Sequence, residues 1–235
     1  MSTVEKFDRL AADQLKAEVP DAVIGREIIV LEQTSSTNDA ILRVASTNGL
    51  PSISEGLVVL AEHQTDGRGQ RGNRWESAAG KGLWFSILLR PEIQLSDSAR
   101  LTVWAIEAIS NVIRIEFGLE PAIKLPNDVQ LNGHKVAGVL VEMRAQDKAP
   151  HLAVVGIGIN VNQCRDDFPA ELRDKAISLA MALGRQVDRQ NFAVALLRNL
   201  DLTYRHKFSK GVAAFNSSPA PTTIRDKRVA KFRKA

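Results

Sequence analysis

The chain has 235 residues, of which 44% are hydrophobic and 25% charged, a composition typical of a soluble globular protein with one large core. No apolar run approaches the roughly 18 residues of a membrane-spanning helix, and the N-terminus lacks the pattern of a secretory signal peptide. The single cysteine, Cys164, excludes an intramolecular disulfide and fits a reducing compartment, so we expect a cytoplasmic protein without a membrane partner.

The net charge of +4 comes from the C-terminal end of the chain. Residues 225–235 carry six basic side chains and one acidic side chain, which leaves 25 basic and 26 acidic side chains elsewhere. Because a nucleic-acid-binding face needs positive charge spread over the domain, we do not expect a nucleic-acid partner. Residues 209–235 are also rich in Ser, Pro and Thr, which predicts a basic, disordered tail after one domain over residues 1–208.

The chain begins with a predicted helix, a strand and a second helix. Residues 4–18 have an amphipathic pattern that ends before Pro20, and residues 26–33 (REIIVLEQ) are typical of a strand. The second helix follows directly after this strand and ends at Gly49, a natural helix stop.

The start of this second helix carries hydroxyl and amide side chains. Ser36 followed three residues later by Asp39 is typical of a capping box. One interpretation is that Ser36 and Thr37 only cap the helix. The other is that their hydroxyls, together with Asn38, face a ligand at the strand-to-helix turn, and the two interpretations are compatible.

A loop rich in glycine and arginine, GRGQRGNRW (residues 67–75), follows a buried strand predicted over residues 57–62. Glycine lets backbone amides approach a ligand closely, and arginine suits phosphate or carboxylate, so the loop predicts an anion site. A solvated surface turn is the alternative. The loop also matches G-x-G-x-x-G, but the dinucleotide fingerprint needs a helix at once, and here a polar segment and a strand over residues 82–90 follow.

The second half of the chain predicts a helix, three strands and two further helices. These elements span residues 96–118, 122–131, 135–143, 151–162, 169–183 and 188–208. Asn132-Gly133 lies between the first two strands and predicts an antiparallel hairpin. This order of elements predicts an α+β fold in which helices flank a mixed, largely antiparallel sheet.

Polar side chains follow these strands at positions where a ligand could lie. Lys124 interrupts an apolar strand, which is costly unless its ammonium has an anionic partner. Asn127 and Asp128 come next, and Asp128 is a candidate Mg²⁺ ligand, although one carboxylate has little metal specificity. Lys135 either faces the same ligand or is an ordinary solvated lysine. Asn160 either binds a polar group of the ligand or is a turn residue at the end of its strand.

Five motifs, in this order, resemble the catalytic domain of a biotin–protein ligase. They are STN (36–38), EHQTDGRGQRGNRW (62–75), KLPND (124–128), KVAGVLVE (135–142) and GIGIN (156–160). The resemblance covers roughly residues 25–208 and implies the biotin/lipoate ligase fold, which is similar to class II aminoacyl-tRNA synthetases. It implies that biotin and ATP, with Mg²⁺, form biotinyl-5′-adenylate, from which a lysine of a biotin-carrier domain is biotinylated.

The same resemblance implies a role for individual residues. Those implied in biotin binding are Ser36, Thr37, Asn38, Gln64, Gly67, Arg68, Lys124 and Gly138. Those implied in ATP and adenylate binding are Arg68, Gln70, Arg71, Trp75, Asn127, Asp128, Lys135 and Asn160. Lys124 and Arg68 are the implied catalytic residues, since cations stabilise the charge that develops on the carboxylate and phosphate. We also expect residues 66–75 to close over the adenylate.

The chain departs from the family pattern in several places. Gln70 stands where a second arginine is frequent, and Leu125 stands where tryptophan is common. We expect no DNA-binding domain before Ser36, and we expect the family's small C-terminal β-barrel to be truncated or absent. Relatives often form dimers through the edges of their sheets, but the sequence shows no dedicated seam for a homodimer. The alternative functions are a lipoate– or octanoate–protein ligase or transferase of the same fold, and a non-enzymatic regulator that binds biotin or nucleic acid.

Overall fold

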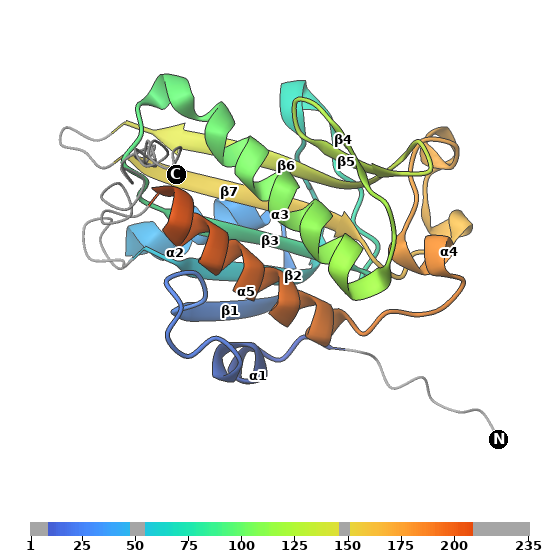
Figure 1. Ribbon diagram of the computed structural model, residues 1–235, viewed down its shortest axis with the longest axis horizontal. Coiled ribbons are helices and arrows are strands. Elements are labelled where there is room, and N and C mark those ends of the chain that lie inside the picture. Colours follow the sequence, from blue (N-terminus) through green and yellow to red (C-terminus); the bar gives the residue numbers. More distant parts are fainter. Residues whose placement is uncertain (1–8, 48–54, 146–150, 209–235) are drawn as a thin grey trace, which may run out of the picture.

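A single sheet organises the chain in the computed structural model, which describes residues 9–47, 55–145 and 151–208 (Figure 1). Its strands are β1 (Glu27–Thr34), β2 (Leu57–Gln64), β3 (Gly82–Leu89), β4 (Ala122–Lys124), β5 (Asp128–Leu131), β6 (His134–Arg144) and β7 (Leu152–Asn160). The helices are α1 (Ala12–Ala17), α2 (Thr37–Thr47), α3 (Ala99–Phe117), α4 (Leu179–Leu183) and α5 (Arg189–Phe208). None of the described helices is long and apolar enough to cross a bilayer.

The seven strands lie in the order β1-β2-β3-β7-β6-β5-β4. Only β1 and β2 run parallel, and every other neighbouring pair is antiparallel. The predicted fold class, a mixed and largely antiparallel sheet flanked by helices, is therefore confirmed. The predicted tail, residues 209–235, lies outside the described residues.

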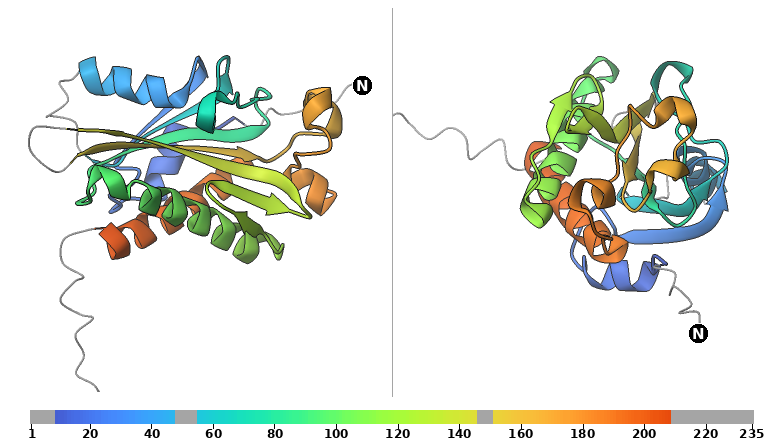
Figure 2. Two further views of the ribbon diagram at one scale, coloured as in Figure 1. Left: turned by 90° about the horizontal axis from the view of Figure 1, so that it is seen from above. Right: turned by 90° about the vertical axis from the view of Figure 1, so that its right-hand side faces the viewer.

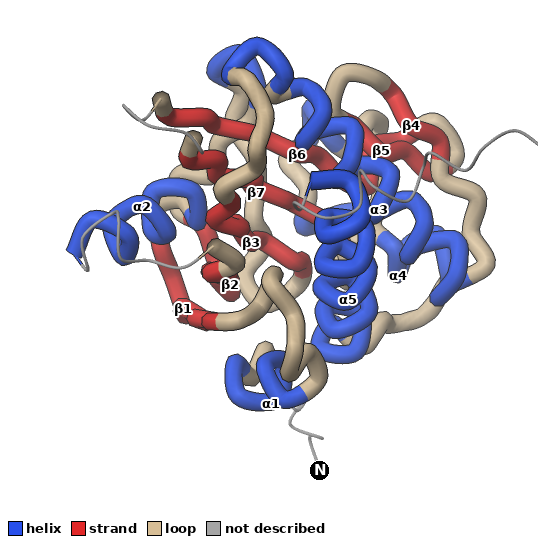
Figure 3. The backbone as a smooth tube through the Cα atoms, turned by 60° about the vertical axis from the view of Figure 1, so that its left-hand side comes forward, coloured by secondary structure: helices blue, strands red, loops and turns tan. Residues whose placement is uncertain are grey.

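Helices cover the sheet unequally on its two faces. Helices α3 and α5 lie side by side on one face, and α2 lies on the other (Figures 2 and 3). Because side chains alternate across a strand, Val155 and Ile157 of β7 enter the large core under α3 and α5, whereas Val154 enters a smaller core under α2. The smaller core leaves one end of its sheet face uncovered by helix, and the candidate site lies there.

Two predicted elements differ from the structure. Residues 122–131, predicted as one strand, form β4 and β5, because the chain turns back between them and Lys124 pairs with Asp128. Pro126, which has no N–H to donate, lies in this turn. The helix predicted over residues 169–183 is reduced to α4, preceded by the 3₁₀ turn Ala170–Leu172.

Other local predictions are confirmed by the backbone. The hairpin between β5 and β6 turns at Asn132 and Gly133, whose φ angles are 51° and 81°. Helix α3 ends at Gly118 with φ 64°. The first helix, α1, is shorter than predicted, and residues 4–8 of the prediction lie outside the described residues.

Candidate active site

A cavity lies on the α2 face of the sheet, between the start of α2, the loop after β2, and strands β6 and β7. It brings together nine of the residues singled out from the sequence: Ser36, Thr37, Asn38, Gln64, Arg68, Trp75, Asn127, Lys135 and Gly138. Gly69, Val139, Leu140, Gly156, Ile157 and Gly158 complete the lining. Motifs that are far apart in the sequence therefore converge at one place.

The floor of the cavity is bare backbone. Gly138 of β6 and Gly158 of β7 are paired directly across the two strands, and Gly156 precedes Gly158 on the same face. A Cβ atom on Gly158 would lie 2.5 Å from the Trp75 indole, and one on Gly156 would lie 2.3 Å from the Asn38 amide oxygen. Glycine is required here because the indole and the amide lie directly on the strands.

One end of the cavity is a hydrogen-bonded cluster of hydroxyl and amide groups. The backbone N–H and the hydroxyl of Thr37 donate to Gln64 Oε1 at 2.8 and 3.1 Å. The Ser86 hydroxyl lies 2.6 Å from Asn38 Oδ1 and 2.8 Å from Thr37 Oγ1, and Gln64 Nε2 donates to Ser77 Oγ at 3.2 Å. This end can read a polar head group through paired donors and acceptors.

Sequence reasoning missed the two serines that support this cluster, Ser77 and Ser86. Ser86 is fully buried in β3, among apolar residues. A hydroxyl inside an otherwise apolar strand is costly to bury without a hydrogen-bond partner. The serine at position 86 was therefore the one feature of the sequence that could have indicated a buried polar cluster.

The other end of the cavity carries the ammonium of Lys135. Its Nζ lies 2.6 Å from Asp128 Oδ1 and 5.3 Å from the centroid of a Trp75 ring, which is a cation–π distance. Asn127 Nδ2 donates to the Val139 carbonyl at 3.0 Å and so fixes the turn before β5 against β6. A compact cation next to an aromatic wall can receive a carboxylate or a phosphate.

The guanidinium of Arg68 lies at the mouth of the cavity between two carboxylates. It donates to both oxygens of Asp39, at 2.5 and 2.8 Å, and its Nη2 lies 3.6 Å from Glu142 Oε2. Asp39, predicted as part of a helix cap, is thus paired with the glycine loop. The hydrogen bond from Arg68 lowers the pKa of Asp39, and the same bond raises the pKa of Arg68.

The glycine loop folds back on itself over the cavity. The N–H of Trp75 donates to the Gly67 carbonyl at 2.8 Å, and that of Gly69 to the Asn73 carbonyl at 2.7 Å. A Cβ on Gly67 would lie 2.5 Å from the Trp75 carbonyl oxygen, so the two arms of the loop meet only because residue 67 is glycine.

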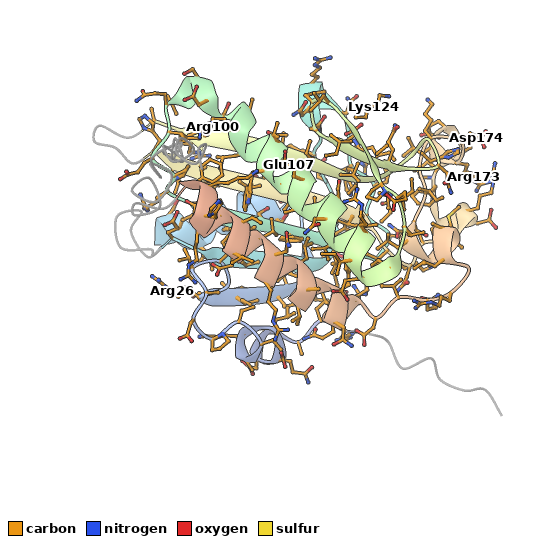
Figure 4. All side chains as sticks on the ribbon, viewed as in Figure 1. Arg26, Arg100, Glu107, Lys124, Arg173 and Asp174 are labelled. Carbon is orange, nitrogen blue, oxygen red and sulfur yellow. The ribbon has the colours of Figure 1, made fainter. Side chains whose placement is uncertain are left out.

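Several predicted site residues lie outside the cavity lining. Lys124 is exposed on the edge strand β4, one strand beyond Asp128 (Figure 4). Gln70 and Arg71 form the 3₁₀ turn Gln70–Gly72 at the tip of the loop, where Arg71 has φ 60° and is exposed. Gly67 belongs to the base of that loop.

Asn160 is buried and bonded within the protein. Its Nδ2 donates to the carbonyls of Lys135 and Ile177, at 3.4 and 3.2 Å, and its Oδ1 accepts from Gln163 Nε2 at 3.1 Å. It therefore ties the end of β7 to the segment beside Lys135. Gln163, which is also buried, was not singled out from the sequence.

The donor set does not suit a magnesium ion. The described residues contain no group of three or more His, Cys, Asp or Glu side chains that could hold a metal. Asp128, the predicted Mg²⁺ ligand, is paired with Lys135. The described residues therefore offer no set of protein ligands for Mg²⁺.

The ion pair between Asp39 and Arg68 predicts an acid-sensitive site. The lowered pKa of Asp39 means that the pair stabilises the fold fully above the ordinary carboxyl pKa of about 3.9, and that this contribution is lost as pH falls through the lower folded pKa. Arg43 and Arg144 act in the same direction, and Glu142 is the other carboxylate at Arg68. The melting-temperature difference between wild type and Asp39→Asn should be constant from pH 5 to 8 and shrink below about pH 4; a difference that grows on acidification would contradict this.

Several known proteins that are similar to this chain in sequence are named as ligases, and some of these names include biotin. The chain is 36% identical over 208 residues to "Bifunctional ligase/repressor BirA" of Bacillus spizizenii. This alignment covers 88% of this chain and 63% of that protein. It is 33% identical over 204 residues to "Biotin--[acetyl-CoA-carboxylase] ligase" of Mycobacterium tuberculosis, covering 83% and 72%. The chain thus spans less than two thirds of the length of the Bacillus relative.

Solved structures resemble the fold described above. The biotin protein ligase from Aquifex aeolicus in complex with biotin and ATP superposes with a TM-score of 0.66 at 29% identity, over 81% of this chain and 75% of that chain. The family model described as "Biotin/lipoate A/B protein ligase family" matches residues 30–160, which include all the cavity-lining residues. Together with the identity to the mycobacterial ligase, this match shows that the chain belongs to the biotin/lipoate A/B protein ligase family.

Proposed function

We propose that this protein is an ATP-dependent biotin–protein ligase that acts in the cytoplasm. One observation carries the proposal: a single cavity joins a cluster of hydroxyl and amide groups at one end to the cations Lys135 and Arg68. Biotin has a polar ureido head and a carboxylate tail separated by an apolar body. The glycine floor and the Trp75 wall suit that body.

The reaction consists of two displacements. The biotin carboxylate attacks the α-phosphate of ATP, so that biotinyl-5′-adenylate forms and pyrophosphate leaves. The ε-amine of a lysine on a biotin-carrier domain then attacks the carbonyl of this anhydride, loses a proton and releases AMP. Both steps need positioning and stabilisation of developing negative charge, which fixed cations provide.

The geometry supports specific roles for the cavity residues. Thr37, Gln64 and the neighbouring Ser36 would bind the ureido head, and Lys135 would meet the carboxylate and α-phosphate. Sequence reasoning gave this catalytic role to Lys124. The position of Lys135 inside the cavity and of Lys124 on an exposed edge strand favours Lys135.

The decisive experiment is to incubate the protein with biotin, Mg-ATP and a biotin-carrier domain and to measure the mass of the acceptor. We expect one biotinyl group per acceptor, and none when ATP is omitted. In parallel incubations that offer lipoate or octanoate in place of biotin, attachment of either acid would establish the alternative ligase or transferase function. Biotin binding without release of pyrophosphate would establish a non-enzymatic regulator.

Adding one methyl group to the glycine floor should weaken biotin binding. Gly158→Ala places its Cβ 2.5 Å from the Trp75 indole, so the indole, whose ring centroid lies 6.0 Å from that of Trp84, has to shift. Overpacking of this kind costs about 1–3 kcal/mol, so biotin affinity, measured by calorimetry, should fall roughly 5- to 150-fold.

Gly118→Ala is the matched control for this variant. Its Cβ meets nothing within 4 Å, and its φ of 64° adds backbone strain far from the cavity. It should therefore lower the melting temperature without changing biotin affinity. Unchanged biotin affinity in Gly158→Ala would show that biotin does not lie on the floor.

A further inference from the structure

The glycine loop is attached to the rest of the molecule at its base, through Arg68, and through Trp75 at its far end, which packs on the strand glycines and against Trp84. At the base, the backbone N–H groups of Thr65 and Asp66 donate to the carbonyls of Thr34 and Ser35, both at 2.9 Å. Beyond this point the backbone hydrogen bonds described above close the loop on itself. The Arg68 side chain then joins the loop to α2 and β6 across the mouth of the cavity.

Two carboxylates from different elements hold this guanidinium. Asp39, in the first turn of α2, engages Nη1 and Nη2 in a fork-to-fork pair, the strongest geometry for an arginine ion pair. Glu142 of β6 approaches from the other side, and its Oε2 also accepts from Asn38 Nδ2 at 2.6 Å. Glu142 therefore links the loop to Asn38, a side chain that lines the cavity.

The Arg68 guanidinium keeps hydrogen-bond donors for a ligand while it is paired with Asp39. A guanidinium has five N–H groups in one plane, and the pair with Asp39 engages two of them. The side chain is 37% exposed and lines the cavity. It can remain bound to Asp39 while it donates to a carboxylate or phosphate below it.

We propose that Asp39 and Glu142 are positioning residues that hold Arg68, and with it the glycine loop, closed over the cavity, so that an acyl-adenylate is retained until the acceptor arrives. This role rests on the proposed function. Neither carboxylate touches the reacting atoms. Their effect is exerted through the position of Arg68, and opening the loop requires the ion pairs to break.

The test uses isosteric variants that remove charge and preserve shape. Asp39→Asn weakens the fork, and Glu142→Gln keeps an oxygen that can accept from Asn38. Glu107→Gln is the control, because it removes a carboxylate of similar exposure that pairs with Lys207 on the opposite face of the sheet (Figure 4). Each variant is compared with wild type in the full chain.

Two readouts separate the inference from the proposed function. The first is amide hydrogen exchange of residues 67–73 in the ligand-free protein, which needs no activity. The second is the rate at which biotinyl-adenylate, formed in one turnover without acceptor, escapes into solution. Because the pairs are partly exposed, we expect each variant to accelerate exchange and escape roughly two- to fivefold, and the double variant to do so further.

The outcomes are distinct. In an Arg68→Ala background, Asp39→Asn should add nothing, since the two residues act through one contact. Unchanged exchange and escape in both carboxylate variants, or slower escape, would overturn the inference; slower escape would mean that the carboxylates compete with the ligand for Arg68. A wild-type protein that forms no adenylate would refute the proposed function, and hydrogen exchange would still decide whether the carboxylates hold the loop.

Discussion

Replacing Lys135 with alanine should slow biotinyl-adenylate formation by roughly 10²–10³-fold, the usual cost of removing one charge-stabilising donor from an active site. The ammonium lines the cavity at the end opposite to the hydroxyl cluster, beside the Trp75 wall. Lys124→Ala removes an exposed lysine one strand further out, and its rate should stay close to that of wild type. Pyrophosphate release in the absence of acceptor measures this step directly.

A structural effect of the Lys135 variant can be separated from a catalytic one. Removing the ammonium leaves Asp128 without its ion-pair partner, so the double variant Lys135→Ala, Asp128→Asn is the control for an uncompensated charge. It should recover stability without recovering rate. If Lys124→Ala were the slow variant instead, the nucleotide would have to lie over the edge strand β4, and the assignment of Lys135 would be wrong.

Replacing Arg189 with alanine should lower the free energy of unfolding by about 3–5 kcal/mol, the cost of breaking a buried ion pair from one side. Arg189 is 1% exposed at the start of α5, and its Nη1 donates to Glu62 Oε2 at 2.7 Å and to the Gly82 carbonyl at 3.1 Å. Glu62 lies on the strand that leads into the glycine loop and also accepts from the Leu10 N–H. Chemical denaturation measures the difference.

Arg198→Ala provides a control from the same helix. Arg198 also forms an ion pair with a glutamate, Glu18, but the two side chains are 56% and 54% exposed. Exposed pairs contribute about 0–1 kcal/mol, so this variant should be nearly as stable as wild type. Equal losses in the two variants would mean that burial does not set the strength of the Arg189 pair.

Local sequence patterns were sufficient for most elements of this fold, but not for the turn that divides residues 122–131 or for the irregular segment that precedes α4. Asn-Gly specified the hairpin between β5 and β6 because both residues tolerate positive φ, and the apolar period of α3 specified its buried face. Residues of the site were found as motifs because glycine and arginine have unusual local chemistry. These signals depend on neighbours in the chain, which a sequence displays directly.

The roles of the two lysines could not be predicted in the same way. The apolar residues around Lys124 suggested that its ammonium would be costly to bury without an anionic partner. Its strand lies at the edge of the sheet, however, where the ammonium is solvated. Lys135 and Gly138 would occupy opposite faces of a regular strand. A register shift between β5 and β6 leaves Val136 unpaired, so both Val136 and Ala137 enter the core and Lys135 lies on the cavity face.

Long-range pairs were equally inaccessible to sequence reasoning. Asp39 looked like a helix-capping residue, and only the folded loop brings Arg68 to it. Glu62 and Arg189 are separated by 127 positions in the sequence. Glutamate and arginine usually lie at the protein surface, so neither residue type suggested a buried ion pair. Ion pairs between residues far apart in the chain form only when the sheet assembles, and they leave no periodic pattern in the sequence from which they could be predicted.

The three glycines beneath Asn38 and Trp75 have a consequence for how the protein depends on its substrate. Where they lie, the sheet contributes no side chains to the layer that Val154 and Leu88 build under α2. The Asn38 amide and the Trp75 indole fill part of that layer, and a vitamin bound beside them would add further contacts. Any ligand that binds only the native state stabilises it by mass action. The lifetime of the protein under proteolysis should therefore lengthen as the vitamin becomes abundant, which couples its abundance to supply without a dedicated sensor.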